Sequence, residues 1–125
     1  MTSATTPLCT WVWNIATDEI SWNQAMQDLY GLPNLTFPIK LAQWQKFIFA
    51  EDNEKITSLI SENTKSEVEC SIKVILPHQQ YAVHKLFGRT QTDSAGKIMG
   101  IVGYCQEVSV HHINESMPIA QTIFN

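Results

Sequence analysis

A long stretch of alternating side chains, from Val83 to Ser109, places the strongest constraint on how this chain can fold. It has the pattern of two strands joined at residues 93–96, where Gly96 can supply the positive φ that a tight hairpin needs. Apolar residues fall on both faces of the second strand, so both faces must be covered or lined. The rest of the chain must therefore build further layers around this hairpin.

Shorter periodic segments supply those layers. Alternation with period two predicts further strands at Cys9–Ile15, Glu19–Trp22 and Val68–Leu76. Apolar residues at helical spacing predict three short helices, one between Asn23 and Gly31, one over Leu41 to Ile48, and one over Ile56 to Ile60. Strands grouped apart from helices predict an α+β fold, with an antiparallel sheet whose one face is covered by the helices.

Composition excludes several classes of function. The 125 residues suit a single domain, and a net charge of −4 with one arginine, Arg89, argues against nucleic acid as a partner. No apolar run approaches the ~20 residues of a membrane segment, and residues 1–8 lack the pattern of a signal peptide. The three cysteines are widely spaced without a Cys-x-x-Cys pair, so we expect a reducing, cytoplasmic location.

Several short motifs occur in a recognisable order. They are Trp11-Val12-Trp13-Asn14, then Glu19 to Asn23 followed by Ala25, Leu29 and Gly31, the acidic end of Phe49 to Asp52, Ile101-Val102-Gly103, and finally Glu107-Val108-Ser109. Over Cys9 to Ser109 this order resembles a PAS domain, most closely the branch found in bacterial histidine kinases and diguanylate cyclases. The departures are mild, such as Asn14 and Glu107 where that branch usually has aspartate.

The resemblance implies both a fold and a function. The implied fold is a PAS-like five-stranded antiparallel sheet with short helices packed over one face and a pocket between them. The implied function is a sensory module that binds a small-molecule ligand or a protein partner and relays its state to an output domain of the same parent chain. We therefore expect a flexible N-terminal arm at 1–8, the sensor domain at 9–109, and a connector toward the output module at 110–125.

Alternation also proposes the residues of a ligand site. If one period-two set of the last strand points inward, it forms the floor of the pocket, with one residue of the first strand beside it and two of the third helix above. The expected ligand-binding residues are Ile101, Gly103 and Cys105 on the floor, Trp13 beside them, and Ile56 and Ile60 above. Gly103 leaves room for a ligand, whose identity stays open.

The end of the same strand is the expected signal relay, formed by Glu107, Val108 and Ser109. Period two puts Glu107 on the face of Cys105 but nearer the exit of the domain. Lys85 or Lys97 is a candidate partner for its carboxylate. The resemblance further implies a homodimer that pairs through the outer sheet face, where Val12 is one exposed apolar residue.

Haem, flavin and metal ions are not expected, and the identity of any other cofactor stays open. In some relatives a histidine on one helix binds haem. None of the four histidines of this chain falls on the helix that resembles it, so haem is not expected; they are His78, His84, His111 and His112. Light-sensing relatives carry a reactive cysteine on a middle helix, and Asn34 to Asn63 contains no cysteine, so the resemblance does not imply flavin photochemistry here. Adjacent residues of an extended chain point apart, so His111-His112 alone is not expected to bind a metal.

Two other classes of function fit parts of the sequence. The apolar hairpin would suit a small non-enzymatic carrier of apolar ligands, and acidic residues would suit a small enzyme that transfers protons, namely Glu67, Glu69, Asp93 and Glu107. Neither explains the opening, middle and closing motifs together. We therefore expect no catalytic activity in this chain, and a kinase or cyclase domain of the parent protein would lie outside it.

Overall fold

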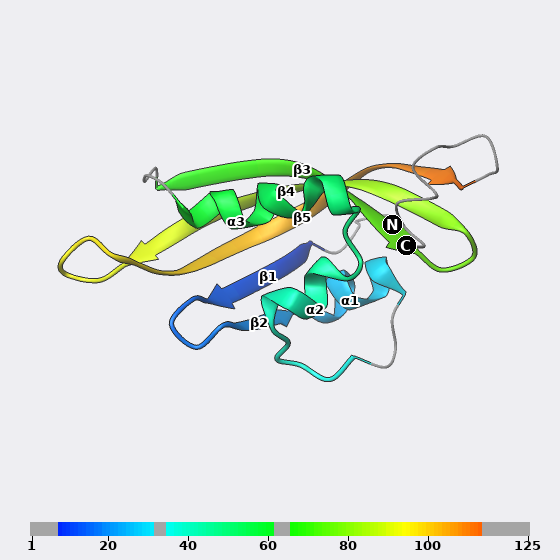
Figure 1. Ribbon diagram of the computed structural model, residues 1–125. Coiled ribbons are helices and arrows are strands. Elements are labelled where there is room, and N and C mark those ends of the chain that lie inside the picture. Colours follow the sequence, from blue (N-terminus) through cyan, green and yellow to red (C-terminus); the bar gives the residue numbers. More distant parts are fainter. Residues whose placement is uncertain (1–7, 32–34, 62–65, 114–125) are drawn as a thin grey trace, which may run out of the picture.

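The computed structural model describes residues 8–31, 35–61 and 66–113, which form one sheet and a set of short helices (Figure 1). The strands are β1 (Cys9–Asn14), β2 (Glu19–Trp22), β3 (Glu67–Leu76), β4 (Gln80–Thr92) and β5 (Ile98–His112). The helices are α1 (Gln24–Tyr30), α2 (Leu41–Gln45), the 3-10 helix η1 (Ala50–Asp52) and α3 (Asn53–Ser61).

The sheet has the order β2-β1-β5-β4-β3, and every neighbouring pair is antiparallel. The longest strand, β5, occupies the centre and pairs with β1 on one side and β4 on the other. The helices all lie on one face of the sheet (Figure 1). The predicted α+β fold, with a five-stranded antiparallel sheet and short helices over one face, is therefore confirmed. We call the helix-covered face the inner face and the opposite face the outer face.

Local signals in the sequence set the ends of α1. The Asn23 side chain accepts a hydrogen bond from the Met26 backbone N–H at 2.9 Å, which satisfies a donor that the first turn of a helix leaves unpaired. Gly31 ends the helix in the left-handed conformation, with φ 66°. The short helix between these caps buries Met26 and Tyr30 against the inner face.

The second helix is shorter than the sequence predicts, because the segment from Phe47 to Phe49 is extended. α2 ends at Gln45, and Ile48 instead forms an antiparallel bridge with Val74 of β3. The Ile75 N–H donates to the Phe47 carbonyl at 2.7 Å, and the Phe49 N–H donates to the Lys73 carbonyl at 2.9 Å. β3 is an edge strand with unpaired backbone groups, so this extended segment satisfies bonds that a longer α2 would leave open.

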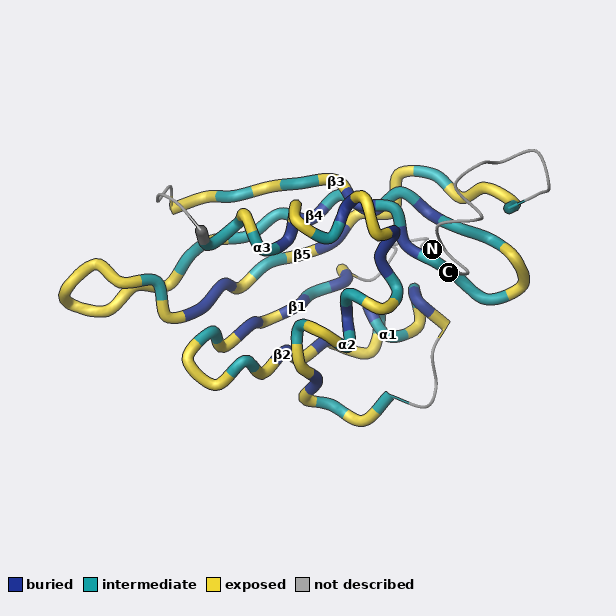
Figure 2. Tube along the Cα trace, viewed as in Figure 1, coloured by how far each residue is buried: buried dark blue, intermediate teal, exposed yellow. Residues whose placement is uncertain are grey.

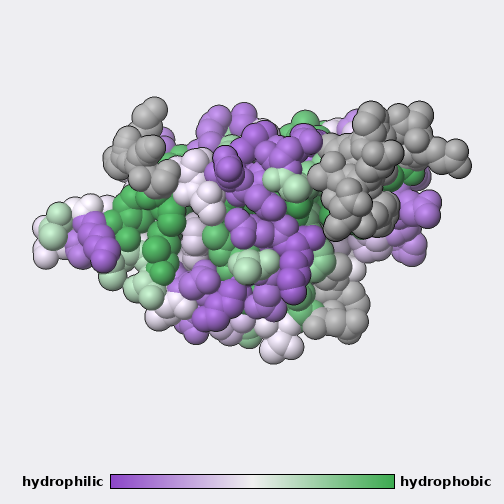
Figure 3. All heavy atoms as spheres, viewed as in Figure 1, coloured by the Kyte–Doolittle hydropathy of each residue, from purple (hydrophilic) through white to green (hydrophobic). Residues whose placement is uncertain are grey.

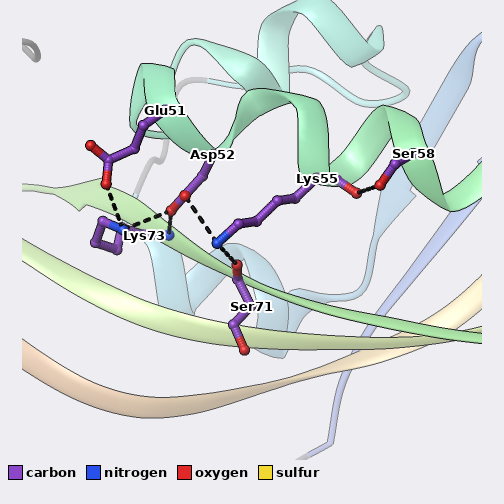
Figure 4. A network of polar contacts seen from close by, with 6 residues as sticks. All are labelled: Glu51, Asp52, Lys55, Ser58, Ser71 and Lys73. Carbon is purple, nitrogen blue, oxygen red and sulfur yellow. Dashed lines mark hydrogen bonds and ion pairs between the residues drawn. The ribbon is translucent and has the colours of Figure 1, made fainter.

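Asp52 joins the helical layer to β3 (Figure 4). Its carboxylate is buried, accepts a hydrogen bond from the Lys73 backbone N–H at 2.8 Å, and pairs with the ammonium groups of Lys55 and Lys73 at 3.1 and 3.2 Å. Burial raises the pKa of Asp52, but these donors outweigh burial and hold the pKa below its ordinary value. Glu51 also pairs with Lys73, at 2.8 Å, on the exposed side.

The turns of the two long hairpins are stabilised by different residues. At the β4–β5 turn Gly96 has φ 86°, as predicted, and the Asp93 carboxylate accepts hydrogen bonds from the Ala95 and Lys97 backbone N–H groups. At the β3–β4 turn His78 and Gln79 both adopt positive φ, at 65° and 58°. No glycine or asparagine marks this second turn, so the sequence pattern did not predict a tight turn there.

The end of β5 lies beyond the expected end of the sensor domain. The strand continues to His112, and its last residues pair with the beginning of β4, including His112 with Gln80. Residues 110–112, which the sequence assigns to the connector, are thus part of the sheet.

Burial follows the layered arrangement. Figure 2 shows buried segments along the strands and on the parts of the helices that face the sheet, whereas the hairpin turns are exposed. The view from the helix side shows mainly hydrophilic residues over its middle, with hydrophobic residues gathered toward the base of the β4–β5 hairpin (Figure 3).

Candidate functional site

A tryptophan fills the inner face where two glycines meet. Gly88 of β4 and Gly103 of β5 are partners in the sheet, and Trp11 of β1 is the partner of Gly103 on the other side. A Cβ atom added to Gly103 would lie 2.8 Å from the Trp11 ring and would collide with the Phe87 carbonyl oxygen. The room that Gly103 provides is therefore taken up by the side chain of Trp11.

Trp11 belongs to a buried aromatic cluster between the sheet and the helices. Its ring lies edge-on to Trp44 of α2 at 5.6 Å between centroids, and Trp44 lies edge-on to Trp22 of β2 at 5.5 Å. Trp22 contacts Tyr30 of α1 at 4.5 Å, and the Trp44 indole N–H donates to the Tyr30 hydroxyl at 2.9 Å. We call Trp11, Trp22, Tyr30 and Trp44 the aromatic cluster.

The residues expected to bind a ligand lie around this cluster. Ile101 is buried and pairs with Trp13, whose indole N–H donates to the Asp18 carboxylate at 3.2 Å. Cys105 is buried on the same face, two positions beyond Gly103. Ile56 of α3 is buried and Ile60 is half-buried. Ligand binding by these residues remains a prediction.

The buried Cys105 thiol and the half-buried Cys70 thiol are both held in the protonated form. Burial raises the pKa of Cys105 far above its ordinary value, and the neighbouring Cys9 and Glu107 act in the same direction. Burial likewise raises the pKa of Cys70 to about 11. Because the thiolate is the reactive form, neither side chain is poised for nucleophilic chemistry at neutral pH.

A buried histidine pairs with the carboxylate at the end of the central strand. Nε2 of His84 on β4 lies 3.1 Å from Oε2 of Glu107 on β5, and the His84 side chain is fully buried while that of Glu107 is 29% exposed. His84 also lies edge-on to Tyr30 at 5.1 Å. Burial lowers the pKa of His84, and the hydrogen bond with Glu107 only partly opposes that shift. The carboxylate partner is thus His84, not the Lys85 or Lys97 suggested by the sequence.

The His84–Glu107 pair sits beside an irregularity in the sheet. His84 pairs with Glu107 and the preceding Val83 pairs with Ser109, so Val108 is an extra residue with no partner on β4. Such a bulge bends a strand and re-aims the side chains that follow it. All three residues of the expected relay, Glu107, Val108 and Ser109, therefore lie at the point where β5 changes register.

The outer face carries a groove across four strands. It has a volume of about 790 Å³, and the backbone around Gly88 and Gly103 forms part of its floor. Phe87 and Tyr104 stack at 4.7 Å between centroids, and Lys85 lies over the Phe87 ring at 5.3 Å. The exposed apolar residues that line the groove are Leu8, Val12, Val102 and Tyr104.

The acidic residues considered for an enzyme each bind a different partner. Glu67 pairs with Arg89 at 2.8 Å and Glu69 with Lys85 at 3.7 Å. Asp93 binds its own turn and Glu107 binds His84. Within the described ranges, no three His, Cys, Asp or Glu residues come together in a way that could hold a metal ion.

His84 and Trp11 are the two site residues whose roles the sequence pattern did not reveal. His84 alternates with Ala82 and Leu86 on the inner face, but the opposite face of β4 also carries apolar residues. Alternation alone therefore does not show which side chains of β4 point to the inner face. The position of Trp11 depends on the register between β1 and β5, for which a single sequence offered no signal.

Two comparisons of the sequence with known proteins found no match. No protein-family model matches the sequence, and no curated protein matches it either. No helix in the described part of the chain has the length and apolar character needed to cross a membrane.

Solved structures resemble the chain over most of its length. The N-terminal domain of a diguanylate cyclase with PAS/PAC sensor from Marinobacter aquaeolei superposes with a TM-score of 0.67 at 15% identity, covering 82% of this chain and 96% of that one. A sensory box histidine kinase/response regulator from Burkholderia thailandensis gives 0.65 at 16% identity, covering 81% and 76%. The PAS domain of a Colwellia psychrerythraea protein gives 0.62 at 14%, covering 81% and 86%.

These TM-scores, over about four fifths of this chain, indicate the same overall fold. The sequences of these neighbours are too different for the likeness to extend beyond the fold. The chain has the fold of a PAS domain, as found in the sensor regions of histidine kinases and diguanylate cyclases.

Proposed function

We propose that the chain is a sensory module of a signalling protein, which engages a protein partner on the outer sheet face and relays its state through the end of β5. The observation that carries this proposal is the position of β5. One strand lines the outer groove at Val102 and Tyr104, pairs with the buried His84 through Glu107, and ends at His112. A shift of this strand would reach an output domain of the parent chain directly.

The proposed partner is a second copy of the chain. Val12 and Val102 are partners across β1 and β5 on the outer face, and both are exposed, at 46% and 39%. Together with Leu8 and Tyr104 they form an apolar surface in the groove, flanked by the Glu67–Arg89 ion pair. Contiguous apolar surface with a charged rim is typical of protein interfaces, and homodimers most often pair the same patch on both subunits.

Sedimentation velocity tests the homodimer. We expect the wild-type chain to shift from monomer to dimer as its concentration rises, and Val102→Glu to remain monomeric because a carboxylate would be buried without a partner. Ala42→Glu, exposed on α2 over the opposite face, is the matched control and should behave as the wild type. A wild-type chain that stays monomeric to high micromolar concentration would contradict the proposal.

The relay is tested in the intact parent protein. We expect Glu107→Ala to uncouple the output activity, a kinase or cyclase rate, from the state of the domain, while self-association of the isolated chain changes little. Glu54→Ala removes an exposed carboxylate from α3, on the helix side of the sheet, and is the matched control. If output responds normally in Glu107→Ala, the relay leaves the domain elsewhere.

A small-molecule ligand is the second candidate, and one observation favours it. Trp22 Nε1 and His84 Nδ1 are buried and have no hydrogen-bond partner within the described ranges. A polar ligand near the aromatic cluster would supply the missing partners. Of the predicted ligand-binding residues, Trp13, Ile56, Ile101 and Cys105 belong to the same hydrophobic core as Trp22, and Ile60 packs against that core. Native mass spectrometry of freshly purified protein tests the idea, since a ligand would add a constant mass that denaturation removes.

A further inference from the structure

The His84 side chain is an unusual group to find in the interior of this fold. Among the described residues, only His84 and Asp52 are classed as both buried and polar. Asp52 is held by two lysines and a backbone N–H, whereas His84 has one partner, Glu107, through Nε2. Nδ1 of His84 is buried without a partner in the described part of the chain.

This geometry suits the neutral imidazole. In the neutral form Nε2–H donates to the Glu107 carboxylate and Nδ1 is an unprotonated acceptor. Protonation would place a positive charge on a fully buried ring and would create an N–H donor at Nδ1 that meets no acceptor. The nearby Glu107 carboxylate compensates for part of the cost of the buried charge, but it does not provide an acceptor for the Nδ1–H group.

We propose that His84 is a proton-sensitive latch, which holds α1 and the end of β5 together when neutral and releases them when the solution is mildly acidic. The cover over His84 is Tyr30, the last residue of α1, which is itself fully buried. A protonated His84 can regain water only if this cover moves or if the strand moves away at Glu107. Either movement breaks the link from Tyr30 of α1 through His84 to Glu107 of β5.

The hydroxyl and thiol groups near His84 keep their protons at neutral pH. Tyr30 on α1 has a pKa raised well above its ordinary value by burial, and Cys105 on β5 has a raised pKa for the same reason. On β3 the sheet partner of His84 is Ile72, which is apolar, and the Cys70 thiol has a pKa of about 11. Glu107 is the remaining charged neighbour.

The direction of the effect follows from linkage. The folded state lowers the pKa of His84 below the value of 6.5 expected when the chain is unfolded. The unfolded chain therefore binds more protons below pH 6.5, and stability present above that pH is lost as pH falls toward the folded pKa. One proton of difference changes the unfolding equilibrium by up to ~10-fold per pH unit.

Urea unfolding of the 125-residue chain across pH 5 to 8 tests the latch, with pH as the probe. His84→Gln keeps a side-chain N–H donor for Glu107 and cannot titrate. We expect the wild type to lose stability below pH 6.5 by up to ~10-fold per unit relative to His84→Gln. His112→Gln, at an exposed position of β5, is the matched control and should follow the wild type. Equal pH dependence in wild type and His84→Gln would overturn the proposal.

A second measurement does not require a variant to fold. The imidazole C–H resonance of His84, assigned through bonds in the wild-type protein, should titrate with a midpoint below 6.5, with faster amide exchange in α1 and residues 105–112 over the same range. A midpoint at or above 6.5, or a midpoint below it with no change in exchange, would overturn the latch. The latch does not depend on the homodimer, because both measurements can be made on the monomer.

Discussion

The indole of Trp11 on β1 covers Gly103, its partner on β5, and occupies the space that a side chain at position 103 would need. The chain thus fills part of its interior with its own aromatic side chain at the position where the sequence suggested room for a ligand. This relationship favours the outer face and His84 as the places where the domain senses its state, and it makes Gly103 a position where substitution tests packing.

Gly103→Ala should lower the free energy of unfolding by about 1–3 kcal/mol or more, because its methyl group would collide with the Phe87 backbone oxygen and the Trp11 ring. Gly88→Ala is the matched comparison. Its methyl group would meet only side-chain atoms, the nearest being Ile101 Cγ2 at 2.6 Å, and these can shift. Urea unfolding should rank Gly103→Ala as the more destabilised variant, and the reverse order would show that the backbone at Phe87 gives way easily.

The buried hydrogen bond between Trp44 and Tyr30 gives a second prediction. Tyr30→Phe leaves the Trp44 indole N–H buried without its acceptor, so we expect a loss of about 1–3 kcal/mol in the free energy of unfolding. Tyr104→Phe removes the same hydroxyl from an exposed ring on the outer face and should cost less than about 0.5 kcal/mol. Equal losses in the two variants would mean that the hydrogen bond adds nothing.

Asp52 gives a prediction with a pH dependence. Asp52→Asn should destabilise the fold by about 1–3 kcal/mol at neutral pH, because it removes charge-assisted bonds to Lys55 and Lys73. Since the folded state lowers the Asp52 pKa, its stabilisation is present above the ordinary value of 3.8 and is lost as pH falls through the folded pKa. The two proteins should therefore converge in stability below that range.

The control for Asp52 is its exposed neighbour. Glu51→Gln breaks only the surface pair with Lys73 and should change stability by about 0–1 kcal/mol. Thermal unfolding followed from pH 2 to 7 distinguishes the variants. A difference between wild type and Asp52→Asn that does not narrow in acid would contradict the assignment of the effect to the Asp52 charge.

Several features of the fold could be predicted because local chemistry determines them. Alternation located the strands, Asn23 and Gly31 capped α1, and Gly96 made the β4–β5 turn. The apolar spacing of Phe47 and Ile48 fits a helix, so the sequence alone predicts one that continues to Ile48. The extended form of this segment depends on the open edge of β3, which is a tertiary feature.

The site was harder to predict because it depends on register. Glu107 lies on the inner face, as alternation indicated, but its partner His84 is 23 residues away and could be found only from the pairing of β4 with β5. The bulge at Val108 shifts that pairing by one residue. The covering of Gly103 by Trp11 likewise joins the first strand to the last.

Hydrogen exchange measured as a function of protein concentration tests most directly the claim that the outer face and the end of β5 act together. If two copies pair on the outer face, amide exchange in residues 98–112 should slow as the dimer forms, and the effect should reach Glu107 and Ser109 beyond the groove. Val102→Glu should abolish both dimer and slowing, whereas Ala42→Glu should keep them. Dimer formation by sedimentation with unchanged exchange at Glu107 and Ser109 would contradict the account.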